Sequence, residues 1–315
     1  MSLDKKFEDL FLNVSIKAAL SSYHFVGKKD KIAADKSAVD AMRNKLNEIE
    51  MRGKVVIGEG ELDEAPMLYI GETLGTMSGP ELDIAVDPLE GTNFAANNQP
   101  GALSVIAVAE KSNLFSAPET YMNKISANVP SEGIIDLDYS VKKNISNLAD
   151  YKNKQPNELS ACILDRPRHK KIIEELRNLN VNLKLISDGD VSGALLVSDK
   201  KYNIDIFMGI GGGPEGVLAA SALDAFDCFF QGRFIFDNEK DVNRAKKMGI
   251  DDLNKKYLLN EIITGDTIFC ATGITNGDIV SGIKIEANNY ISETLITHKS
   301  TNLKKIIKSK NEIDE

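Results

Sequence analysis

Two carboxylates stand three positions apart in the segment AVDPLEGTNF, residues 85–94, directly after the apolar run LDIAV. A proline follows Asp87, and a glycine and a threonine follow Glu90. Carboxylates at the end of a strand can hold hard divalent cations, because Mg²⁺ and Mn²⁺ prefer oxygen ligands. Asp-Pro and Glu-Gly are also ordinary turn pairs, so this segment by itself fits a plain turn as well as a metal site.

A second group of acids follows the preceding predicted strand, KVVIG at residues 54–58. The segment EGELDEAP supplies Glu59, Glu61, Asp63 and Glu64. A single acid in a loop is usually a solvated charge. Ligands gather at the carboxyl ends of strands in α/β sheets, and crowded carboxylates repel one another unless a cation neutralises them. Two acidic clusters after successive strands therefore predict a divalent metal site.

A further carboxylate, Asp35, stands at the start of the second predicted helix. Aspartate is well suited to cap a helix N-terminus, because its side chain accepts a hydrogen bond from a free backbone N–H. A structural cap would explain this residue without any ligand, and the residues alone leave both roles open.

Three segments in the second half of the chain combine glycine, acids and cations after predicted strands. ISDGDVSGALL contains Asp188–Asp190, and FMGIGGGPEGVL places several glycines before Pro214 and Glu215. Glycines at the start of a helix expose backbone N–H groups that can cradle phosphate, although glycine-rich loops alone are weak evidence. LDRPRHKK places Arg166, Arg168, His169 and Lys170 at a helix start, where cations oppose the helix dipole. An anionic ligand would explain that cost, and a solvated helix start is the alternative.

The pattern of apolar residues predicts an α/β protein. Helical spacing over residues 7–18 and 39–49 is followed by strand-like runs at 54–58, 82–86 and 102–110, and strands alternate with helices after residue 158. The polar, turn-rich segment 142–157 predicts a domain boundary. We therefore expect an N-terminal α/β domain, residues 1–155, with most metal ligands, and a C-terminal α/β domain, residues 156–315. The tail, residues 301–315, is predicted to be a solvated helix or a frayed end.

Composition narrows the classes of partner. The chain has 315 residues and a net charge of -9, which argues against a general nucleic-acid binder. The N-terminal segment has neither the uninterrupted apolar core of a signal peptide nor that of a membrane span. Three dispersed cysteines favour a reducing compartment, and three widely separated histidines disfavour a zinc centre. We expect a cytoplasmic protein without nucleic-acid or membrane partners.

Six motifs in this order carry a family resemblance: KIAADKSAVDAMR, VIGEGELDEAPMLYIGE, DIAVDPLEGT, RPRH, DGDV and GIGGGPEGV. They resemble the class II fructose-1,6-bisphosphatases of bacteria, over nearly the whole chain. DPLEGT is also similar to the signature of the wider lithium-sensitive sugar and inositol phosphatases, with Glu where many members have Asp. The resemblance implies a layered αβαβα sandwich and metal-dependent hydrolysis of the 1-phosphate of fructose 1,6-bisphosphate, giving fructose 6-phosphate and phosphate.

The resemblance also implies roles for individual residues. The implied ligands for Mn²⁺ or Mg²⁺ are Asp35, Glu59, Asp87, Glu90 and Glu215. The implied substrate contacts are Glu90, Gly91, Thr92, Tyr121, Arg166, Pro167, Arg168, Asp188, Gly189, Asp190 and Gly212. Thr92, Asp63 and Lys31 are implied catalytic residues, with the Thr92 hydroxyl directed at the attacking water. A homodimer or homotetramer is implied as the assembly.

Two alternatives remain open beside this interpretation. The substrate could be another phosphate ester, such as sedoheptulose 1,7-bisphosphate or an inositol phosphate, although Arg166 and Arg168 favour a second phosphate. The chain could instead be a non-catalytic sugar-phosphate sensor, although Asp63 and Thr92 would then serve no purpose. The chain departs from the family at Lys29, where glycine is common, and in a shorter segment after Arg233.

Overall fold

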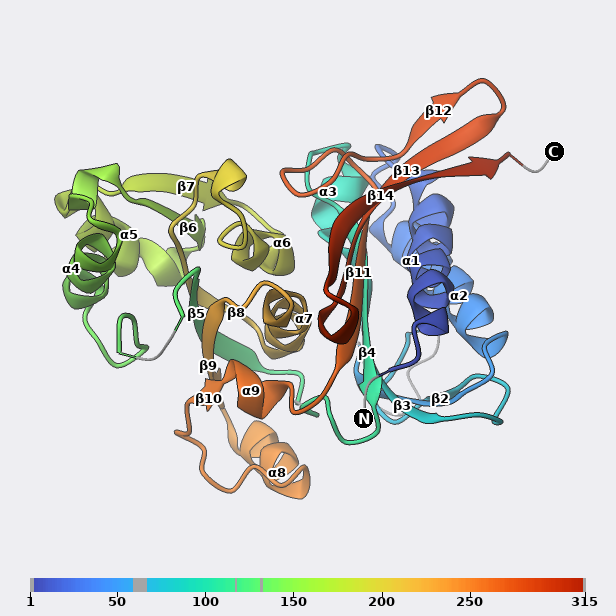
Figure 1. Cartoon of the computed structure of the whole chain (residues 1–315), viewed down its shortest axis with the longest axis horizontal. Helices are drawn as coiled ribbons and strands as arrows, with labels where there is room; N and C mark the ends of the chain where they lie inside the picture. Colours follow the sequence, from blue (N-terminus) through green and yellow to red (C-terminus); the bar gives the residue numbers. More distant parts are fainter. Residues whose placement is uncertain (1–2, 59–66, 117, 131–132, 314–315) are drawn as a thin grey trace. The chain divides into compact units, whose positions relative to one another are not determined.

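The computed structural model describes the chain except for residues 1–2, 59–66, 117, 131–132 and 314–315. The described residues form two compact units (Figure 1). Unit 1 combines residues 1–116 with residues 263–315, and unit 2 consists of residues 117–262. Each unit has its own sheet, so the two are described separately.

Unit 1 is built from two long helices, a mixed sheet and short helical turns. Its helices are α1 (Lys6–Tyr23), α2 (Lys31–Asn47), α3 (Thr92–Ala96) and η4 (Lys299–Thr301). Its strands are β1 (Arg52–Ile57), β2 (Thr73–Leu74), β3 (Glu81–Glu90), β4 (Leu103–Glu110), β11 (Thr267–Gly273), β12 (Lys284–Glu286), β13 (Asn289–His298) and β14 (Leu303–Glu312). Among the described residues the strand order is β12-β13-β11-β4-β3-β1-β2, with β14 paired to β13.

The helices α1 and α2 cover one face of the unit 1 sheet. Apolar residues recur at helical spacing on both helices, so each presents an apolar stripe. These stripes share one buried core with alternate residues of β3 and β4, including Ile84, Val86, Ile106 and Val108. Ala85 and Ala107, which lie between them in sequence, belong to the opposite face because side chains alternate along a strand. The predicted helices and strands of this region are confirmed.

Unit 2 has a mixed sheet between two layers of helices. Its strands are β5 (Tyr121–Ala127), β6 (Ser160–Leu164), β7 (Asn182–Ile186), β8 (Ile206–Gly212), β9 (Phe229–Ile235) and β10 (Tyr257–Leu258). Its α-helices are α4 (Val141–Lys152), α5 (Lys170–Asn178), α6 (Asp190–Leu195), α7 (Gly213–Asp224), α8 (Glu239–Lys247) and α9 (Leu259–Ile262). Three short 3₁₀ turns in the described residues are η1 (Pro156–Glu158), η2 (Pro167–His169) and η3 (Lys200–Tyr202).

The two helix layers of unit 2 bury opposite faces of its sheet. Helices α4 and α5 pack on the face that carries Ile125 and Met208, and these residues form one core with Ile145, Leu148 and Leu176. Helices α6 and α7 approach the other face closely. A Cβ on Gly193 of α6 would lie 3.1 Å from Phe207, and one on Gly216 of α7 would lie 2.5 Å from the sulfur of Met122. Glycine at these two positions therefore allows the close approach.

The expected α/β class is confirmed: unit 1 has helices on one face of its sheet, and unit 2 has a sheet between two layers of helices. The units divide differently from the expected boundary near residue 155. Strand β5 pairs with β8 and β9, so residues 121–127 belong with the later strands. The polar segment 142–157 contains helix α4, which Ser140 caps and which buries Ile145 and Leu148.

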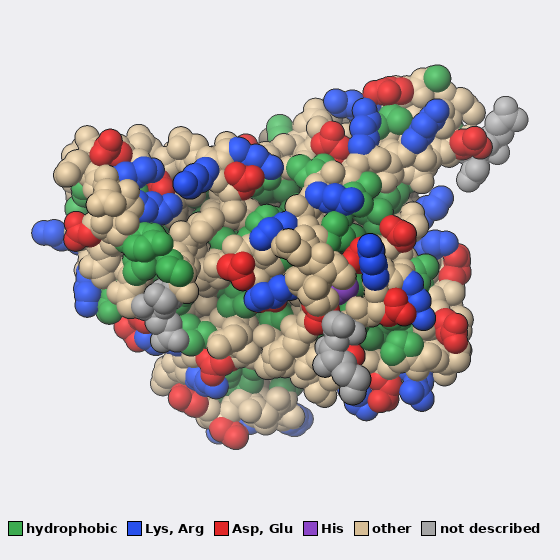
Figure 2. Space-filling model, viewed as in Figure 1, with side chains coloured by type: hydrophobic (Ala, Val, Ile, Leu, Met, Phe, Trp, Pro, Cys, Tyr) green, Lys and Arg blue, Asp and Glu red, His purple; other side chains and the backbone are tan. Residues whose placement is uncertain are grey.

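The prediction that the tail forms a solvated helix or a frayed end is wrong. Residues 303–312 form β14, which pairs with β13 in antiparallel register along its whole length. The alternation of lysine and isoleucine has the period of a strand, and exposed lysines are common on sheet edges because they discourage further pairing. On the face shown in Figure 2, basic and acidic side chains are interspersed.

A buried histidine ties the start of the chain to the unit 1 sheet. Nδ1 of His298 lies 2.7 Å from Glu8 Oε1, and its Nε2 lies 2.9 Å from Asp266 Oδ2. Burial by itself lowers the pKa of His298, but the two carboxylates raise it overall. Burial by itself raises the pKa of Asp266, but hydrogen bonds from His298 and Ser300 lower it to about 2. The Leu3 N–H also donates to Asp266, at 3.0 Å.

We expect the free energy of unfolding to fall as the pH rises above 6.5, the ordinary value for histidine. The folded state keeps a proton on His298 that the unfolded state loses, so this contribution is complete below 6.5 and disappears as the pH passes the raised pKa. The Asp266 contribution is complete above 3.8 and is lost as the pH falls toward 2. Urea unfolding between about pH 5 and 9 measures the first effect.

The control compares two histidine variants. His298→Asn should lack most of the alkaline decline, whereas His24→Asn, at an exposed position, should retain it. The His298 variant should also be less stable at low pH, by about 1–3 kcal/mol, because it leaves buried carboxylate oxygens without their donor. The same alkaline decline in both variants would contradict the assignment to His298.

Candidate active site

The acids of unit 1 lie at one edge of its sheet. Strands β1 and β3 are adjacent and parallel, with Ile57 opposite Ala85, so the chain leaves both strands at the same edge. Asp87 and Glu90 occupy the last part of β3 and are both buried. Glu59 and Asp63, which the sequence places after β1, lie outside the described residues, so their grouping with Asp87 and Glu90 remains a prediction.

A β-bulge turns Asp87 and Glu90 to the same face of the sheet. Residues three apart on a regular strand point to opposite faces. Asp87 is paired with Val105 and Glu90 with Leu103, so three steps on β3 match two steps on β4. Val105 and Leu103 share a face, and their cross-strand partners share it with them. This face is the one opposite α1 and α2.

The residues after the bulge make a tight entry into α3. Gly91 has φ +76°, a left-handed conformation that costs other residues about 1–2 kcal/mol. Thr92 is the first residue of α3, and its hydroxyl donates to the Leu89 carbonyl at 3.2 Å. Gly91 is therefore required by the backbone. The proposed role of Thr92 toward water remains a prediction.

Asp35 is not the N-cap of α2, which was the structural role that the sequence left open for it. The helix begins at Lys31, and its cap is Asp30, whose side chain accepts from the Ala33 N–H at 2.9 Å. Asp35 lies inside the helix, and burial raises the pKa of its carboxyl. Lys31 donates to the Asn93 side chain, which links α2 to α3. Lys29 has φ +60°, so it keeps the left-handed backbone that glycine favours.

The carboxylates do not by themselves make a metal site in the described part of the chain. No group of three or more His, Cys, Asp or Glu that could hold an ion is found there. The expected ligand Glu59 lies outside the described residues. The buried pair of Asp87 and Glu90 on one face still fits a hard cation, because buried carboxylates gain from a neutralising charge.

The expected substrate residues of unit 2 come together at one edge of its sheet. Strands β7 and β8 both run parallel to β6, so the segments that follow these three strands leave at the same edge. Strand β5 runs antiparallel to β8 and begins there, with Tyr121 opposite Gly212. The residues gathered at this edge are Tyr121, Arg166, Pro167, Arg168, Asp188, Gly189, Asp190, Gly212 and Glu215.

Two arginines at this edge are held by neighbours within unit 2. A nitrogen of Arg166 lies 3.7 Å from Asp188 Oδ1. Arg168 donates from Nε to the Ile210 carbonyl at 2.9 Å, and its guanidinium lies 4.9 Å from the centre of the Tyr121 ring. Such contacts reduce the freedom of a flexible cation, so an incoming anion has less side-chain entropy to overcome.

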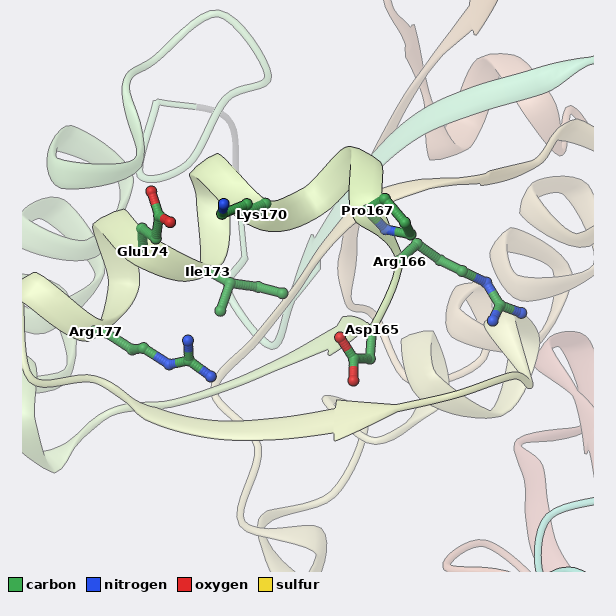
Figure 3. A pocket seen from close by; sticks show the side chains of 7 residues that line it. All are labelled: Asp165, Arg166, Pro167, Lys170, Ile173, Glu174 and Arg177. Carbon is green, nitrogen blue, oxygen red and sulfur yellow. The ribbon is translucent and has the colours of Figure 1, made fainter.

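A pocket of about 320 Å³ adjoins this segment (Figure 3). Its walls carry both signs of charge, with Asp165 and Glu174 beside Lys170 and Arg177. In Figure 3 the Arg166 side chain extends away from the side chains of α5. Arg166 also lines the pocket, so three cations face two acids there, and we assign this pocket no role.

His169 does not belong to the cationic cluster that the sequence predicted. It is fully buried, and burial, the largest influence, lowers its pKa. Its Nδ1 donates to the Leu164 carbonyl at 2.6 Å, and its Nε2 accepts from the Ile210 N–H at 2.7 Å. A neutral imidazole satisfies both bonds. His169 therefore fixes the η2 turn, with Pro167 and Arg168, to strand β8.

The turn from β8 into α7 is closely packed, because side-chain carboxylates fill the space beside its glycines. A Cβ on Gly212 would overlap the carboxylate of Glu215, and one on Gly211 would overlap that of Asp190. Glu215 lies in the first turn of α7, and burial raises the pKa of its carboxyl. Lys124, which our sequence analysis missed, binds Asp190 and the Gly212 carbonyl. The sequence signal for a buried Lys124 was its alternation with Met122 and Ser126, which lie on the same face of β5.

Comparison with known proteins connects this arrangement to a family. The family model described as bacterial fructose-1,6-bisphosphatase, glpX-encoded, matches residues 6–311. The chain belongs to this bacterial fructose-1,6-bisphosphatase family. The match covers both units and every residue named above as a candidate site residue.

Relatives of the bacterial fructose-1,6-bisphosphatase family resemble the chain along most of its length. A protein of Trichodesmium erythraeum named D-fructose 1,6-bisphosphatase class 2/sedoheptulose 1,7-bisphosphatase is 40% identical over 310 residues, covering 90% of each chain. A protein of Prochlorococcus marinus strain AS9601 with the same name is 41% identical over 299 residues, again covering 90% of each chain.

Solved structures show only a distant likeness. An extragenic suppressor from Pyrococcus furiosus has a TM-score of 0.34 at 13% identity, over 62% of this chain and 71% of that one. An inositol monophosphatase from Anabaena has a TM-score of 0.33 at 12% identity, with the same coverage. We base no inference on these two. Within the described residues, every helix falls short of the length and apolarity needed to cross a membrane.

Proposed function

We propose that the protein hydrolyses the 1-phosphate of fructose 1,6-bisphosphate to give fructose 6-phosphate and phosphate, with a divalent cation as cofactor. The observation that carries this proposal is the bulge in β3, which turns two buried carboxylates to one face in a member of this family. A phosphatase needs charge neutralisation and positioning more than a covalent partner.

The proposed ligands for Mg²⁺ or Mn²⁺ are Asp35, Glu59, Asp87, Glu90 and Glu215. A bound divalent cation supplies charge neutralisation for the phosphate and lowers the pKa of water. The chain's own contribution is to hold Asp35 on α2, Asp87 and Glu90 on β3, and Glu215 in the first turn of α7. Lys31, Asp63 and Thr92 are proposed to orient the attacking water and the phosphate beside it.

The proposed substrate contacts in unit 2 suit a ligand with two phosphates. Arg166 and Arg168 present guanidinium groups, which bind phosphate oxygens in a bidentate manner. Asp188 and Asp190 can accept hydrogen bonds from sugar hydroxyls, and Gly189 and Gly212 give the ligand access to the backbone. Tyr121 and Pro167 complete the proposed set in unit 2, and Glu90, Gly91 and Thr92 are the proposed contacts in unit 1.

A second activity on sedoheptulose 1,7-bisphosphate has a specific basis in the names of the relatives, which include both substrates. The two sugars carry the same pair of terminal phosphates on chains that differ by one carbon. We further propose a homodimer or homotetramer located in the cytoplasm.

The test is phosphate release by the purified protein, with chelator, Mg²⁺ or Mn²⁺. The substrates are fructose 1,6-bisphosphate, sedoheptulose 1,7-bisphosphate and an inositol monophosphate. We expect release that requires metal and prefers the bisphosphates. Preference for the inositol ester would contradict the assigned substrate, and metal-dependent sugar-phosphate binding without release would identify a sensor.

Replacing Arg168 by Lys should raise KM for fructose 1,6-bisphosphate by about tenfold, equivalent to roughly 1.4 kcal/mol, with a smaller change in kcat. Lysine keeps the charge but cannot donate to Ile210 and phosphate in the same planar geometry. Arg177→Lys, on the exposed side of α5, is the matched control and should leave KM unchanged. Equal KM values for the two variants would remove Arg168 from the proposed contacts.

A further inference from the structure

The unit 2 sheet contains a buried lysine, Lys124, on the strand that lies between β8 and β9. Lys124 lies on β5 with only 1% of its surface exposed. Its neighbours on the two adjacent strands, Gly209 and Gly232, are both glycines. A Cβ on Gly216 of α7 would lie 3.1 Å from Lys124 Cδ. A Cβ on Gly209 would instead meet His169, and one on Gly232 would meet Met122, so Gly216 of α7 is the glycine of these three that leaves room for the lysine chain.

The ammonium group of Lys124 joins residues from two elements other than its own. Its Nζ contacts Asp190 Oδ2 at the start of α6 and donates to the Gly212 carbonyl at 2.7 Å, at the end of β8. The Lys124 charge also acts favourably on the Glu215 carboxylate in the next turn. One cation therefore joins the start of α6 to the end of β8.

A buried ion pair is a poor way to gain stability. Removing both charges from water costs about as much as their attraction returns, and apolar residues of the same volume often serve equally well. Asp190 is also buried, and its Oδ1 has no hydrogen-bond partner in the described part of the chain. The pair thus leaves one carboxylate oxygen with a fixed position and free acceptor capacity.

We propose that Lys124 is a positioning residue for the substrate site, holding Asp190 and the Gly212 turn in the arrangement that binds the sugar bisphosphate. This inference rests on the proposed function. Lys124 acts through these two residues and does not itself touch the substrate. The variant Lys124→Met removes the cation while keeping a side chain of similar length.

The matched control is Lys152→Met. Lys152 also pairs with a buried aspartate in unit 2, lying 2.8 Å from Asp205 Oδ1. Asp205 directly precedes β8, at the end of that strand away from Gly212. Both variants lose a lysine–aspartate pair, with Asp205 keeping a second pair to Lys154 at 3.2 Å, but only Lys124→Met disturbs the proposed substrate edge.

The experiment measures KM and kcat for fructose 1,6-bisphosphate in the full-length wild type and both variants, with circular dichroism and thermal unfolding on the same samples. Lys124→Met should raise KM at least tenfold with a smaller fall in kcat. Lys124→Arg, which retains a cation, should fall between it and the wild type. Lys152→Met should change KM less than twofold, even where its unfolding temperature falls.

Should Lys124→Met not fold, Lys124→Ala with added propylammonium replaces it, beside 1-propanol as the neutral control. The cation, and not the alcohol, should lower KM toward the wild-type value. A folded Lys124→Met with wild-type KM, or equal rescue by alcohol, would overturn the positioning role. A wild type without metal-dependent release would instead contradict the proposed function.

Discussion

Replacing Asp87 by Asn should reduce kcat for phosphate release by at least about a thousandfold, equivalent to roughly 4 kcal/mol of transition-state stabilisation. The variant keeps the size of the side chain and one oxygen that can accept from the Leu89 N–H, which lies 3.2 Å from Asp87 Oδ1. The bulge should therefore survive while the negative charge is lost. An amide is a much weaker ligand for Mg²⁺ or Mn²⁺ than a carboxylate.

The control for Asp87 lies four residues earlier on the same strand and the same face. Asp83 is also buried, and it accepts from the Leu114 N–H at 3.4 Å. Asp83→Asn should lower stability without a comparable loss of kcat, because Asp83 is not a proposed ligand. Steady-state kinetics across a range of metal concentrations, with circular dichroism, separate these effects. Equal losses of kcat would show that any buried carboxylate on β3 matters and that the ligand assignment is wrong.

Replacing Gly212 by Ala should cost about a hundredfold in kcat/KM, or roughly 2.7 kcal/mol. The new methyl group would occupy the space of the Glu215 carboxylate, so this side chain must leave its position. Glu215 is a proposed metal ligand, and Gly212 is a proposed substrate contact. We therefore expect the metal concentration for half-maximal activity to rise together with KM for the sugar bisphosphate.

The control for Gly212→Ala is Gly277→Ala, because an alanine side chain fits at position 277 without a steric clash. The nearest atom to a Cβ at Gly277 lies 3.5 Å away, an ordinary van der Waals distance. This variant should keep the activity and the metal response of the wild type. Titrating the activity of Gly212→Ala and Gly277→Ala with metal measures the metal response of each variant. A Gly212 variant with an unchanged metal response would mean that Glu215 can move without consequence and is not a ligand.

The sequence predicted which residue types follow each strand, but it could not predict how a bulge orients them. Asp87 and Glu90 were identified from their spacing and residue types. Their common face depends on the register with β4, a long-range property that local sequence does not encode. The reverse holds for His169, which its neighbours placed among surface cations, whereas the fold buries it between β6 and β8.

The least accurate part of the prediction was the division of the chain. Strand β5 was not recognised, because a lysine and an asparagine interrupt its apolar residues. Without β5, the segment before residue 155 had no reason to belong with the later strands. The lysine that hid the strand is Lys124, whose burial depends on Asp190, 66 positions away. Helix α4 was likewise hidden by its polar exposed face, although Ile145 and Leu148 pack into the core.

The discontinuity of unit 1 has a consequence for biosynthesis. Unit 2 is a continuous stretch of chain, whereas the unit 1 sheet needs β11, which is synthesised after unit 2. Until then, β4 is paired with β3 alone, and the edge that later pairs with β11 from Leu103 to Ala109 is uncovered, which favours aggregation. Unit 2 can therefore fold on the ribosome while the first 116 residues must wait, in a state that chaperones would recognise.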